Sequence, residues 1–363
     1  MDVTRENFLN TLPKVEESIL NCDFIAIDTE LSGLRKSNGK LFDEHEERYE
    51  ALRDGCMGYS VIQLGLSCFK HRQEDTEEDK STADEEDKNF GSRHDKWQCD
   101  SYNFYVFPYK VSGLPKQIDR NIEIQASAVQ FLRNNGFSFD ELFDKGIGWL
   151  NNVEEQEVKN MLSENLARSE NTDSDKKAFA IPAEHQDFVN NVIQQIEAFV
   201  QDDTTTTDDK LDLPSSSPFE RKMVYEAVKS SPLNSLIEVQ TCKGSSSREQ
   251  YLSVCKSNKE AKAQKVSNLL TEGCGISRVI QCLTKSQKPL VGHNFLLDIM
   301  HLIDQFLYPL PKSYLEFKEM VRCLFPIMYD TKFISNTSDF KDLIKCKFIH
   351  ISNKMIINRL SFS

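Results

Sequence analysis

A short apolar run that ends in closely spaced acidic residues is the feature that most constrains this chain. Residues 23–28 read Asp-Phe-Ile-Ala-Ile-Asp, and Glu30 follows soon after. Such a run is typical of a strand buried within a sheet. Residues i and i+2 of a strand point to the same face, so Asp28 and Glu30 project together. Carboxylates this close repel each other unless a cation neutralises them, and Mg²⁺ or Mn²⁺ with oxygen ligands fits best.

A second pattern lies far along the chain, at residues 290–301, which read Leu-Val-Gly-His-Asn-Phe-Leu-Leu-Asp-Ile-Met-His. The spacing predicts a short strand, a turn at Gly292 and then a helix. Asp298 lies about one turn into that helix, while His293 and Asn294 lie at the turn. Alone, each pattern has a plain structural explanation as a strand end, a helix cap or a solvated helix residue. Together they are much more specific.

The remaining patterns outline a main domain. Apolar runs at 59–69 and 101–108 predict two further strands, which form a meander with the first. The segment between them, 73–95, is rich in Glu, Asp and Lys and is expected to be a solvated extension. Residues 4–21 predict an amphipathic helix, with a break or kink near Pro13.

A second block interrupts this main domain. Residues 181–256 contain two helical patterns and a strand pair, which predict a small inserted αβ domain. A polar linker at 166–180 precedes it. The main domain then comprises 1–165 and 257–342, and residues 343–363 form a divergent tail.

Composition limits the class of protein. The formal net charge of −13 argues against a chain that coats nucleic acid through a basic face, but not against an enzyme that grips a few nucleotides at a metal-lined cleft. The ten cysteines contain no Cys-x-x-Cys pair, which favours reduced thiols inside the cell. No secretory signal or membrane-spanning run is present, so the nucleus or the cytoplasm is expected.

The chain resembles the poly(A)-specific ribonuclease family of DEDD-type 3′-to-5′ exoribonucleases, which includes nucleases that trim pre-piRNA 3′ ends. The resemblance covers roughly residues 1–342. It is carried by Asp28–Leu34, Glu47–Tyr49, Gln63–Leu66, Asn103–Pro108, Gly136–Phe139, Gly275–Ile280, Gly292–His301, Glu316–Met320 and Phe325–Lys332.

The resemblance implies an α/β fold, with a ribonuclease-H-like mixed sheet flanked by helices and an inserted small αβ nucleic-acid-binding domain. It implies hydrolysis of single-stranded RNA from its 3′ end, above all of poly(A) in mRNA decay. The family tends to form homodimers, although no feature of this sequence points to one. The inserted block lacks a clear Arg-x-x-x-His, which leaves its RNA-binding role open.

The resemblance also implies roles for individual residues. Two ions, Mg²⁺ or Mn²⁺, about 4 Å apart would flank the scissile phosphate. Asp28 would bridge both ions, Glu30 would hold the water-activating ion, and Asp298 would steady the second. Substrate-binding roles are implied for Leu31 and Leu34, which would line the pocket of the last base, and for His293 and Asn294 at the turn.

The sequence departs from the family pattern near its end. The family's last motif places a general-base histidine five residues before a fourth carboxylate, and no such pair follows Lys332. The late histidine, His350, has Met355 at that spacing. The tail 343–363 resembles translated AT-rich non-coding sequence, which predicts an alternative transcript or a wrongly assigned gene end. Loss of a general base often costs a factor of about 10²–10⁴ in rate, so this chain is expected to be inactive or nearly so.

Other functions remain open at this point. The pre-piRNA trimming branch shares these motifs. A non-catalytic RNA-binding isoform would keep the fold without turnover. An unrelated domain with a chance Asp-x-Glu is the third alternative.

Overall fold

The computed structural model describes residues 1–34, 44–56, 58–72, 96–116, 118–170, 181–202, 209–244, 250–257 and 259–337. The acidic segment 73–95 and the tail 343–363 lie outside these residues. The chain divides into two compact units. The first comprises Met1–Ser112, Lys116–Gln156 and Thr271–Ser363, and the second comprises Gly113–Pro115 and Glu157–Leu270. No helix within the described residues is both long enough and apolar enough to cross a membrane.

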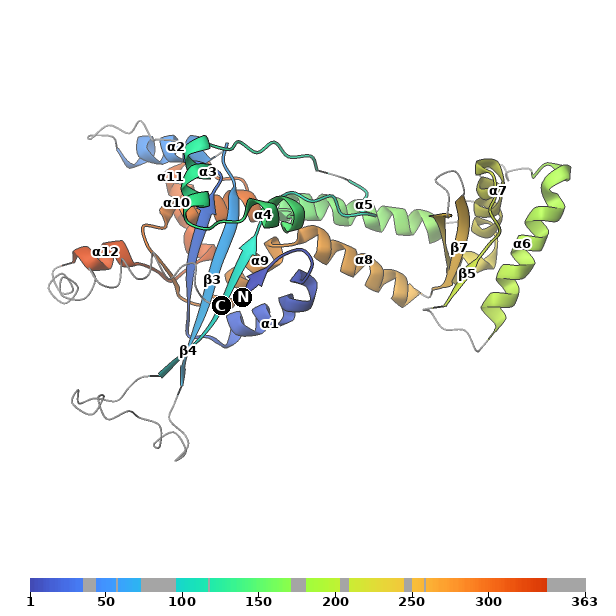
Figure 1. The fold of residues 1–363 in the computed structure, drawn as a ribbon, viewed down its shortest axis with the longest axis horizontal. Coiled ribbons are helices and arrows are strands. Elements are labelled where there is room, and N and C mark those ends of the chain that lie inside the picture. Colours follow the sequence, from blue (N-terminus) through green and yellow to red (C-terminus); the bar gives the residue numbers. More distant parts are fainter. Residues whose placement is uncertain are drawn as a thin grey trace, which may run out of the picture. The chain divides into compact units, whose positions relative to one another are not determined.

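A six-stranded mixed sheet forms the centre of the first unit (Figure 1). The strands, in spatial order, are β1 (Asp2–Val3), β4 (Lys96–Tyr105), β3 (Val61–Arg72), β2 (Phe24–Leu31), β8 (Leu290–Gly292) and β9 (Met328–Asp330). The strands β2, β3 and β4 pair antiparallel, which confirms the predicted meander. The strands β8 and β9 then continue the sheet in parallel with β2. This order confirms the ribonuclease-H-like mixed sheet that the family resemblance implies.

Helices cover both faces of this sheet. Phe104 of β4 belongs to the main core, whereas its neighbour Tyr105 points to the opposite face and packs with Leu132 and Leu142. The helices of the first unit are α1 (Phe8–Asn21), α2 (His45–Cys56), α3 (Ala126–Asn134), α4 (Phe139–Lys145), α9 (Ser277–Ser286), α10 (Leu296–Phe306), α11 (Tyr314–Leu324) and α12 (Thr331–Asn336).

The helix α1 shows how the apolar pattern determines burial. Phe8, Leu12, Val15 and Ile19 recur at helical spacing and all lie in the core. The expected break near Pro13 is wrong, because α1 runs through this residue. Pro13 lies on the exposed face of the helix, where water can satisfy the carbonyl group that its missing N–H leaves unpaired.

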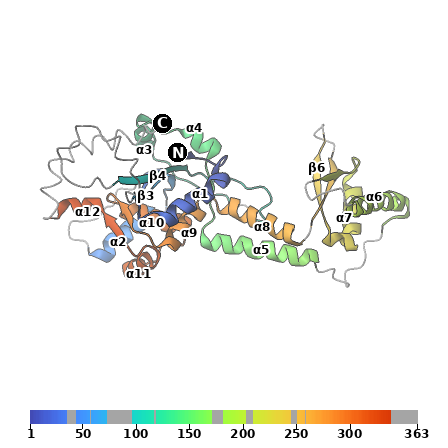
Figure 2. The same cartoon turned by 90° about the horizontal axis from the view of Figure 1, so that it is seen from below.

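The second unit has its own sheet and core (Figure 2). Its strands are β5 (Lys210–Asp212), β7 (Gln250–Lys256) and β6 (Ile237–Lys243), in that spatial order and all antiparallel. Its helices α6 (Ala183–Gln201) and α7 (Pro218–Lys229) contact each other and bury Val192, Ile196, Val224 and Val228. A short 3₁₀ helix, Pro232–Ser235, joins α7 to β6. Ser217 and Glu220 form a reciprocal capping box at the start of α7.

Two long helices connect the units in sequence. They are α5 (Asn152–Glu170) and α8 (Lys259–Cys274). Residues 166–170, expected as part of the linker 166–180, belong to α5 instead. Leu, Ala, Arg and Glu in this stretch are strong helix formers, which explains why the helix extends this far. Residues 171–180 lie outside the described part of the chain.

Candidate active site

The parallel pairing of β2 with β8 brings the two sequence patterns to one edge of the sheet. Ile25 pairs with Leu290, and Ala26 pairs with Val291. Asp28 lies shortly beyond the paired residues of β2, and the turn after Gly292 lies shortly beyond those of β8. Because the carboxyl ends of parallel strands meet at the same edge, residues far apart in the sequence become neighbours there.

Asp28 and Glu30 lie within β2 and are both half-buried. The alternation of the strand directs their side chains to the same face, as the sequence predicts. Asp28 pairs with Gly65 of β3, and Glu30 pairs with Gln63. The absence of a side chain at Gly65 leaves the strand next to Asp28 uncrowded. The register shifts between Glu30 and Leu31, so the meander is irregular just where the acidic pair ends.

Asp298 reaches β2 from the first turn of α10. Its Oδ1 atom accepts a hydrogen bond from the Thr29 amide, 3.1 Å away, and a second one from the Thr29 hydroxyl. Thr29 separates Asp28 from Glu30 in the sequence. The structure therefore places all three predicted acidic residues at the same edge of the sheet.

The electrostatics of Asp298 reflect this position. Burial raises the pKa of the Asp298 carboxyl, the Thr29 hydroxyl lowers it, and the nearby charge of Asp28 raises it again. Burial and the repulsion between the two acids leave an excess of negative charge that a divalent cation would relieve. The donor set, carboxylate oxygens alone, suits Mg²⁺ or Mn²⁺.

The ligand geometry itself is not assembled. Among the described residues, no three His, Cys, Asp or Glu side chains gather closely enough to hold a metal ion. The Oδ1 atom of Asp298 is bonded to Thr29 rather than directed at a common point with the other two acids. The residue types and their shared edge fit a divalent cation, whereas the coordination remains a prediction.

His293 and Asn294 are exposed at the turn, where the end of β9 and the start of α12 hold them. His293 Nδ1 lies 3.0 Å from the Thr331 hydroxyl. Asn294 adopts a left-handed backbone conformation, with φ of 54°, and its amide donates to Asp330 Oδ1 over 2.9 Å. Lys332 Nζ donates to the Asn294 side-chain oxygen over 3.1 Å. The turn is thus bonded both to the end of β9 and to the first residues of α12.

Asp330 is the centre of this arrangement. Burial alone would raise its pKa, but the backbone amides of Asn294, Lys332 and Phe333 together hold the pKa of the Asp330 carboxyl below its usual range. The ionised side chain caps α12 and fixes the turn at the same time. In the sequence, Asp330 and Lys332 belong to a motif of the family resemblance but are not predicted as site residues. The signal that could have found them is the strand end, since β9 continues the sheet beside β8.

The leucines predicted to bind the last base differ in their surroundings. Leu31 is half-buried and packs against the main core. Leu34 is 55 % exposed, and its amide donates to Gln125 Oε1 over 2.8 Å. Leu34 therefore offers an open apolar surface, whereas Leu31 offers only part of its side chain.

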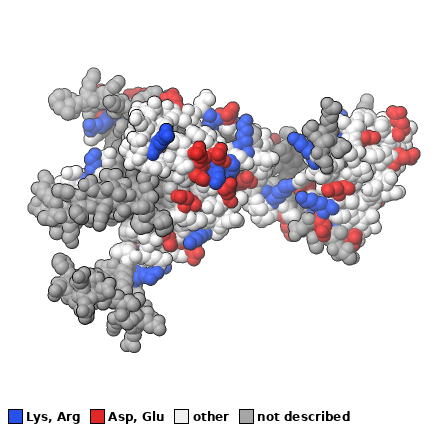
Figure 3. All heavy atoms as spheres, viewed as in Figure 1, with Lys and Arg blue, Asp and Glu red and all other residues white. Residues whose placement is uncertain are grey.

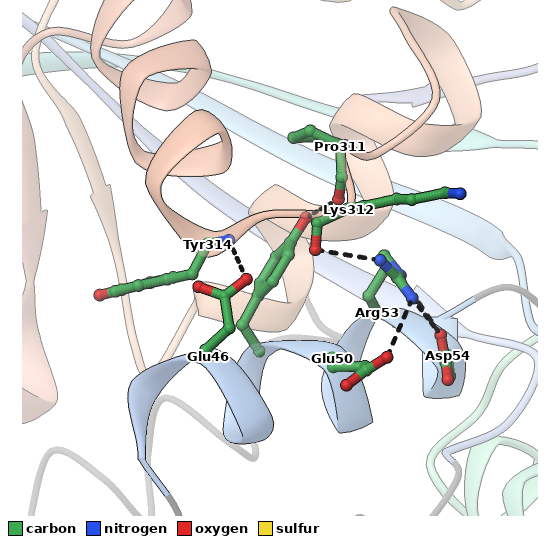
Figure 4. Close-up of polar contacts among 8 residues, drawn as sticks. Glu46, Glu50, Arg53, Asp54, Pro311, Lys312 and Tyr314 are labelled. Atoms are coloured by element: carbon green, nitrogen blue, oxygen red, sulfur yellow. Dashed lines mark hydrogen bonds and ion pairs between the residues drawn. The ribbon is translucent and has the colours of Figure 1, made fainter.

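The helix α2 fixes the segment that links α10 to α11 (Figure 4). Glu46 Oε1 accepts a hydrogen bond from the Tyr314 amide over 2.9 Å, and Arg53 donates to the Lys312 carbonyl over 3.1 Å. Arg53 is in turn paired with Asp54 at 3.0 Å. These contacts fix the segment that follows α10, the helix that carries Asp298 in its first turn.

Charge on the surface is mixed. On the face drawn in Figure 3, Lys and Arg of the described residues lie among Asp and Glu rather than in one continuous basic area. This distribution agrees with the net charge of −13. This face therefore lacks the continuous basic area that broad coating of a nucleic acid requires.

Comparison with known proteins identifies the family of this chain. Residues 3–359 match the model of the CAF1 family ribonuclease domain. The chain is 32 % identical to "Poly(A)-specific ribonuclease PARN" of Xenopus laevis, over 95 % of this chain and 53 % of the relative. It is 28 % identical to "Poly(A)-specific ribonuclease PNLDC1" of Mus musculus, over 97 % of this chain and 61 % of the relative. It therefore spans about half the length of the PARN relatives and somewhat more of PNLDC1.

A solved structure of S. pombe Pop2p in its Mg²⁺- and Mn²⁺-bound form aligns with 96 % of this chain and 82 % of that chain. Its sequence identity is 13 % and its TM-score is 0.41.

Proposed function

Because the chain belongs to the CAF1 family of ribonucleases, we propose that it is a metal-dependent exoribonuclease that removes nucleotides from the 3′ end of single-stranded RNA, with poly(A) as the preferred substrate. The observation that carries this proposal is the contact of Asp298 with Thr29, between Asp28 and Glu30. It brings the acidic residues of two distant motifs to one edge of the sheet. With RNA as its substrate, the protein would act in the nucleus or the cytoplasm.

The acidic residues have the first role in this mechanism. Asp28, Glu30 and Asp298 would hold two divalent cations, which in such a site activate water and stabilise the leaving 3′ oxygen. Thr29 orients the Asp298 carboxylate by two hydrogen bonds. The half-buried position of all three acids lowers the effective dielectric constant around them, which strengthens their attraction for cations.

The turn at His293 and Asn294, which Asp330 and Lys332 hold in place, supplies positive charge and helps to position the RNA. Lys332 is exposed and lies against Asn294, at the same strand ends as the acidic residues. A cation here is suited to the phosphate of the terminal nucleotide. The hydroxyl of Thr331 fixes the ring of His293 beside it, and Leu34 offers an apolar surface on which a base can rest.

We propose a binding role for the second unit that does not depend on its buried arginine. Arg221 donates hydrogen bonds to the Ser216 carbonyl and to the Gln250 backbone and side chain. Because these contacts occupy the guanidinium group, Arg221 stabilises the fold of the unit. An RNA strand would have to be bound by its exposed residues instead.

The experiment uses an oligo(A) RNA labelled at its 5′ end, with either a free or a blocked 3′ hydroxyl. Because no general-base histidine and fourth carboxylate follow Lys332, we expect this chain to shorten the free RNA only slowly, in Mg²⁺-dependent single-nucleotide steps, and the blocked RNA not at all. Asp28→Asn, Glu30→Gln and Asp298→Asn should each abolish it, whereas Glu50→Gln, which alters an exposed acid of α2, should not. Turnover that survives both Asp28→Asn and Asp298→Asn would refute the proposal.

Metal affinity provides a second measurement, independent of turnover. Titration with Mn²⁺ should show binding that Asp28→Asn and Asp298→Asn weaken at least tenfold. Mn²⁺ binding that these substitutions leave unchanged, in a chain that binds RNA without shortening it, would support the non-catalytic RNA-binding alternative.

The similarity to PNLDC1 favours a second candidate, the trimming of pre-piRNA 3′ ends. Oligo(A) and an RNA of mixed sequence distinguish the two when their rates of shortening are compared at equal concentration. A preference for oligo(A) supports the main proposal. Equal rates or a preference for mixed sequence support the trimming function.

A further inference from the structure

A cavity of about 340 Å³ lies in the first unit, where α1 ends and β2 begins. Its walls come from α1, β3 and β4, and they include Lys14, Ser18, Lys70 and Asp100. It is at the opposite end of β2 from Asp28. The proposed nuclease chemistry makes no use of it.

Two cysteines share the wall of this cavity. Cys22 is the residue at which α1 ends, and Cys68 lies on β3. Both side chains line this one cavity and belong to the same buried core cluster, between the end of α1 and the sheet. Next to them, the Asp23 amide donates to the Phe69 carbonyl over 2.7 Å, which fixes the chain where α1 leads into β2. The sequence alone predicts only ordinary reduced thiols at both positions.

The contacts of the two sulfur atoms differ. Cys22 Sγ lies 3.2 Å from the Ile19 carbonyl, to which its thiol donates. The Cys68 thiol donates a hydrogen bond to Cys22, which lowers the pKa of Cys22 despite its burial, and Lys288 lowers this pKa further. The same hydrogen bond and burial raise the pKa of Cys68. Cys22 is thus the nucleophile of the pair, and Cys68 is placed to resolve it.

We propose that Cys22 and Cys68 form a modification site for hydrogen peroxide, which converts the pair into a disulfide between the end of α1 and β3. The Cys22 sulfur attacks one peroxide oxygen and breaks the O–O bond, which gives a sulfenic acid, and the other oxygen leaves as water with the thiol proton. The Cys68 sulfur then attacks the Cys22 sulfur and displaces its hydroxyl, which leaves as a second water with the Cys68 proton. Two thiols are oxidised, and one peroxide is reduced to two waters.

Burial determines which oxidant can reach the pair. Cys22 is 2 % exposed and Cys68 is 3 % exposed, so only a molecule small enough to enter the cavity reaches them. Hydrogen peroxide meets this condition. Cys56 and Cys274 are also buried, and burial raises the pKa of each to about 12, which keeps them protonated and slow to react.

The test treats the whole folded chain, in a Cys99→Ser, Cys323→Ser background that removes two exposed thiols, with peroxide at low molar excess. The remaining thiols are then alkylated in denaturant, and the chain is digested without reduction. We expect a peptide that joins Cys22 to Cys68, identified by fragmentation because Cys56 lies on the same tryptic peptide as Cys68. The unfolding temperature should rise on oxidation and return after reduction.

Matched variants separate the two steps. In Cys68→Ser, the sulfenic acid of Cys22 should persist and be trapped by a cyclic diketone added with the denaturant. In Cys22→Ser, Cys68 should stay reduced, and Cys274→Ser should cross-link as the parent does. Circular dichroism checks that each variant is folded, and Cys22→Ala replaces any serine variant that is not. The proposal is overturned if Cys22 stays reduced while Cys274 is oxidised, or if Cys22 is oxidised without joining Cys68.

Discussion

The Asp298 carboxylate accepts hydrogen bonds from both the amide and the hydroxyl of Thr29, across 269 positions of sequence. The amide bond is 3.1 Å long. This double contact joins the first turn of α10 to β2 at the point where Asp28 and Glu30 flank Thr29. The distance between the two motifs at this edge of the sheet is therefore determined by one side chain of each.

Replacement of Thr29 by Val should weaken this connection without changing the shape of the residue. A hydrogen bond to a charged group contributes about 1.5–3 kcal/mol, so we expect Mn²⁺ affinity and turnover to fall at least about tenfold. Thr29→Ser keeps the hydroxyl and should retain most of both. Equal losses for Val and Ser would contradict a specific role of the hydroxyl.

Stability should depend on pH through His301. This histidine is 4 % exposed, and burial lowers its pKa from 6.5 to about 4. Between these two values the unfolded chain binds a proton that the folded chain does not. The free energy of unfolding should therefore be highest above pH 6.5 and fall as the pH approaches 4, by about 3 kcal/mol in total.

The comparison with His301→Phe isolates this contribution, because other buried acids titrate in both chains. Chemical unfolding at several pH values should give a shallower slope for the variant between pH 6.5 and 4. Identical slopes for the two chains would exclude His301 as the cause.

Tyr49 should contribute to stability through two separable contacts. Its ring stacks on Phe317 with centroids 4.9 Å apart, and its hydroxyl donates to the Pro311 carbonyl over 2.7 Å. Burial raises the pKa of Tyr49 to about 12, so the hydroxyl stays protonated and able to donate. Tyr49→Phe should cost about 1 kcal/mol in the free energy of unfolding, and Tyr49→Ala about 3–5 kcal/mol. If the two variants unfold at the same denaturant concentration, the ring contributes less to stability than the hydroxyl does.

Gly275 should tolerate no side chain. Its φ is +47°, and a Cβ atom there would overlap the Gly148 carbonyl oxygen. Trp149 also bridges to Gly275, so the backbone cannot move away without losing that pairing. We expect Gly275→Ala to lower the free energy of unfolding by about 2 kcal/mol or more.

Gly65→Ala is the matched control, since a Cβ atom at Gly65 would lie at an ordinary 3.6 Å from the Asp28 carbonyl oxygen. Thermal unfolding of the two variants should differ clearly. A Gly275→Ala chain as stable as Gly65→Ala would contradict the strain at Gly275.

Local pattern was enough to predict much of this protein. The apolar run before Asp28 predicts β2, and the strand-to-turn-to-helix pattern around Gly292 predicts β8 and α10. Burial requires apolar residues to recur with the period of a helix or a strand, and that period is visible along the chain. The sequence also predicts a break or kink near Pro13, but α1 runs through this residue, because water can satisfy the unpaired carbonyl group on the exposed face of the helix.

The tertiary structure decided which distant residues meet. No local pattern reveals that Asp298 bonds to Thr29, that Asp330 and Lys332 hold Asn294, or that Cys22 lies beside Cys68. These contacts depend on the order of strands in the sheet and on the register between them. The sequence determined the elements because each one buries its own apolar face, whereas the site depends on pairings between elements that only the folded sheet creates.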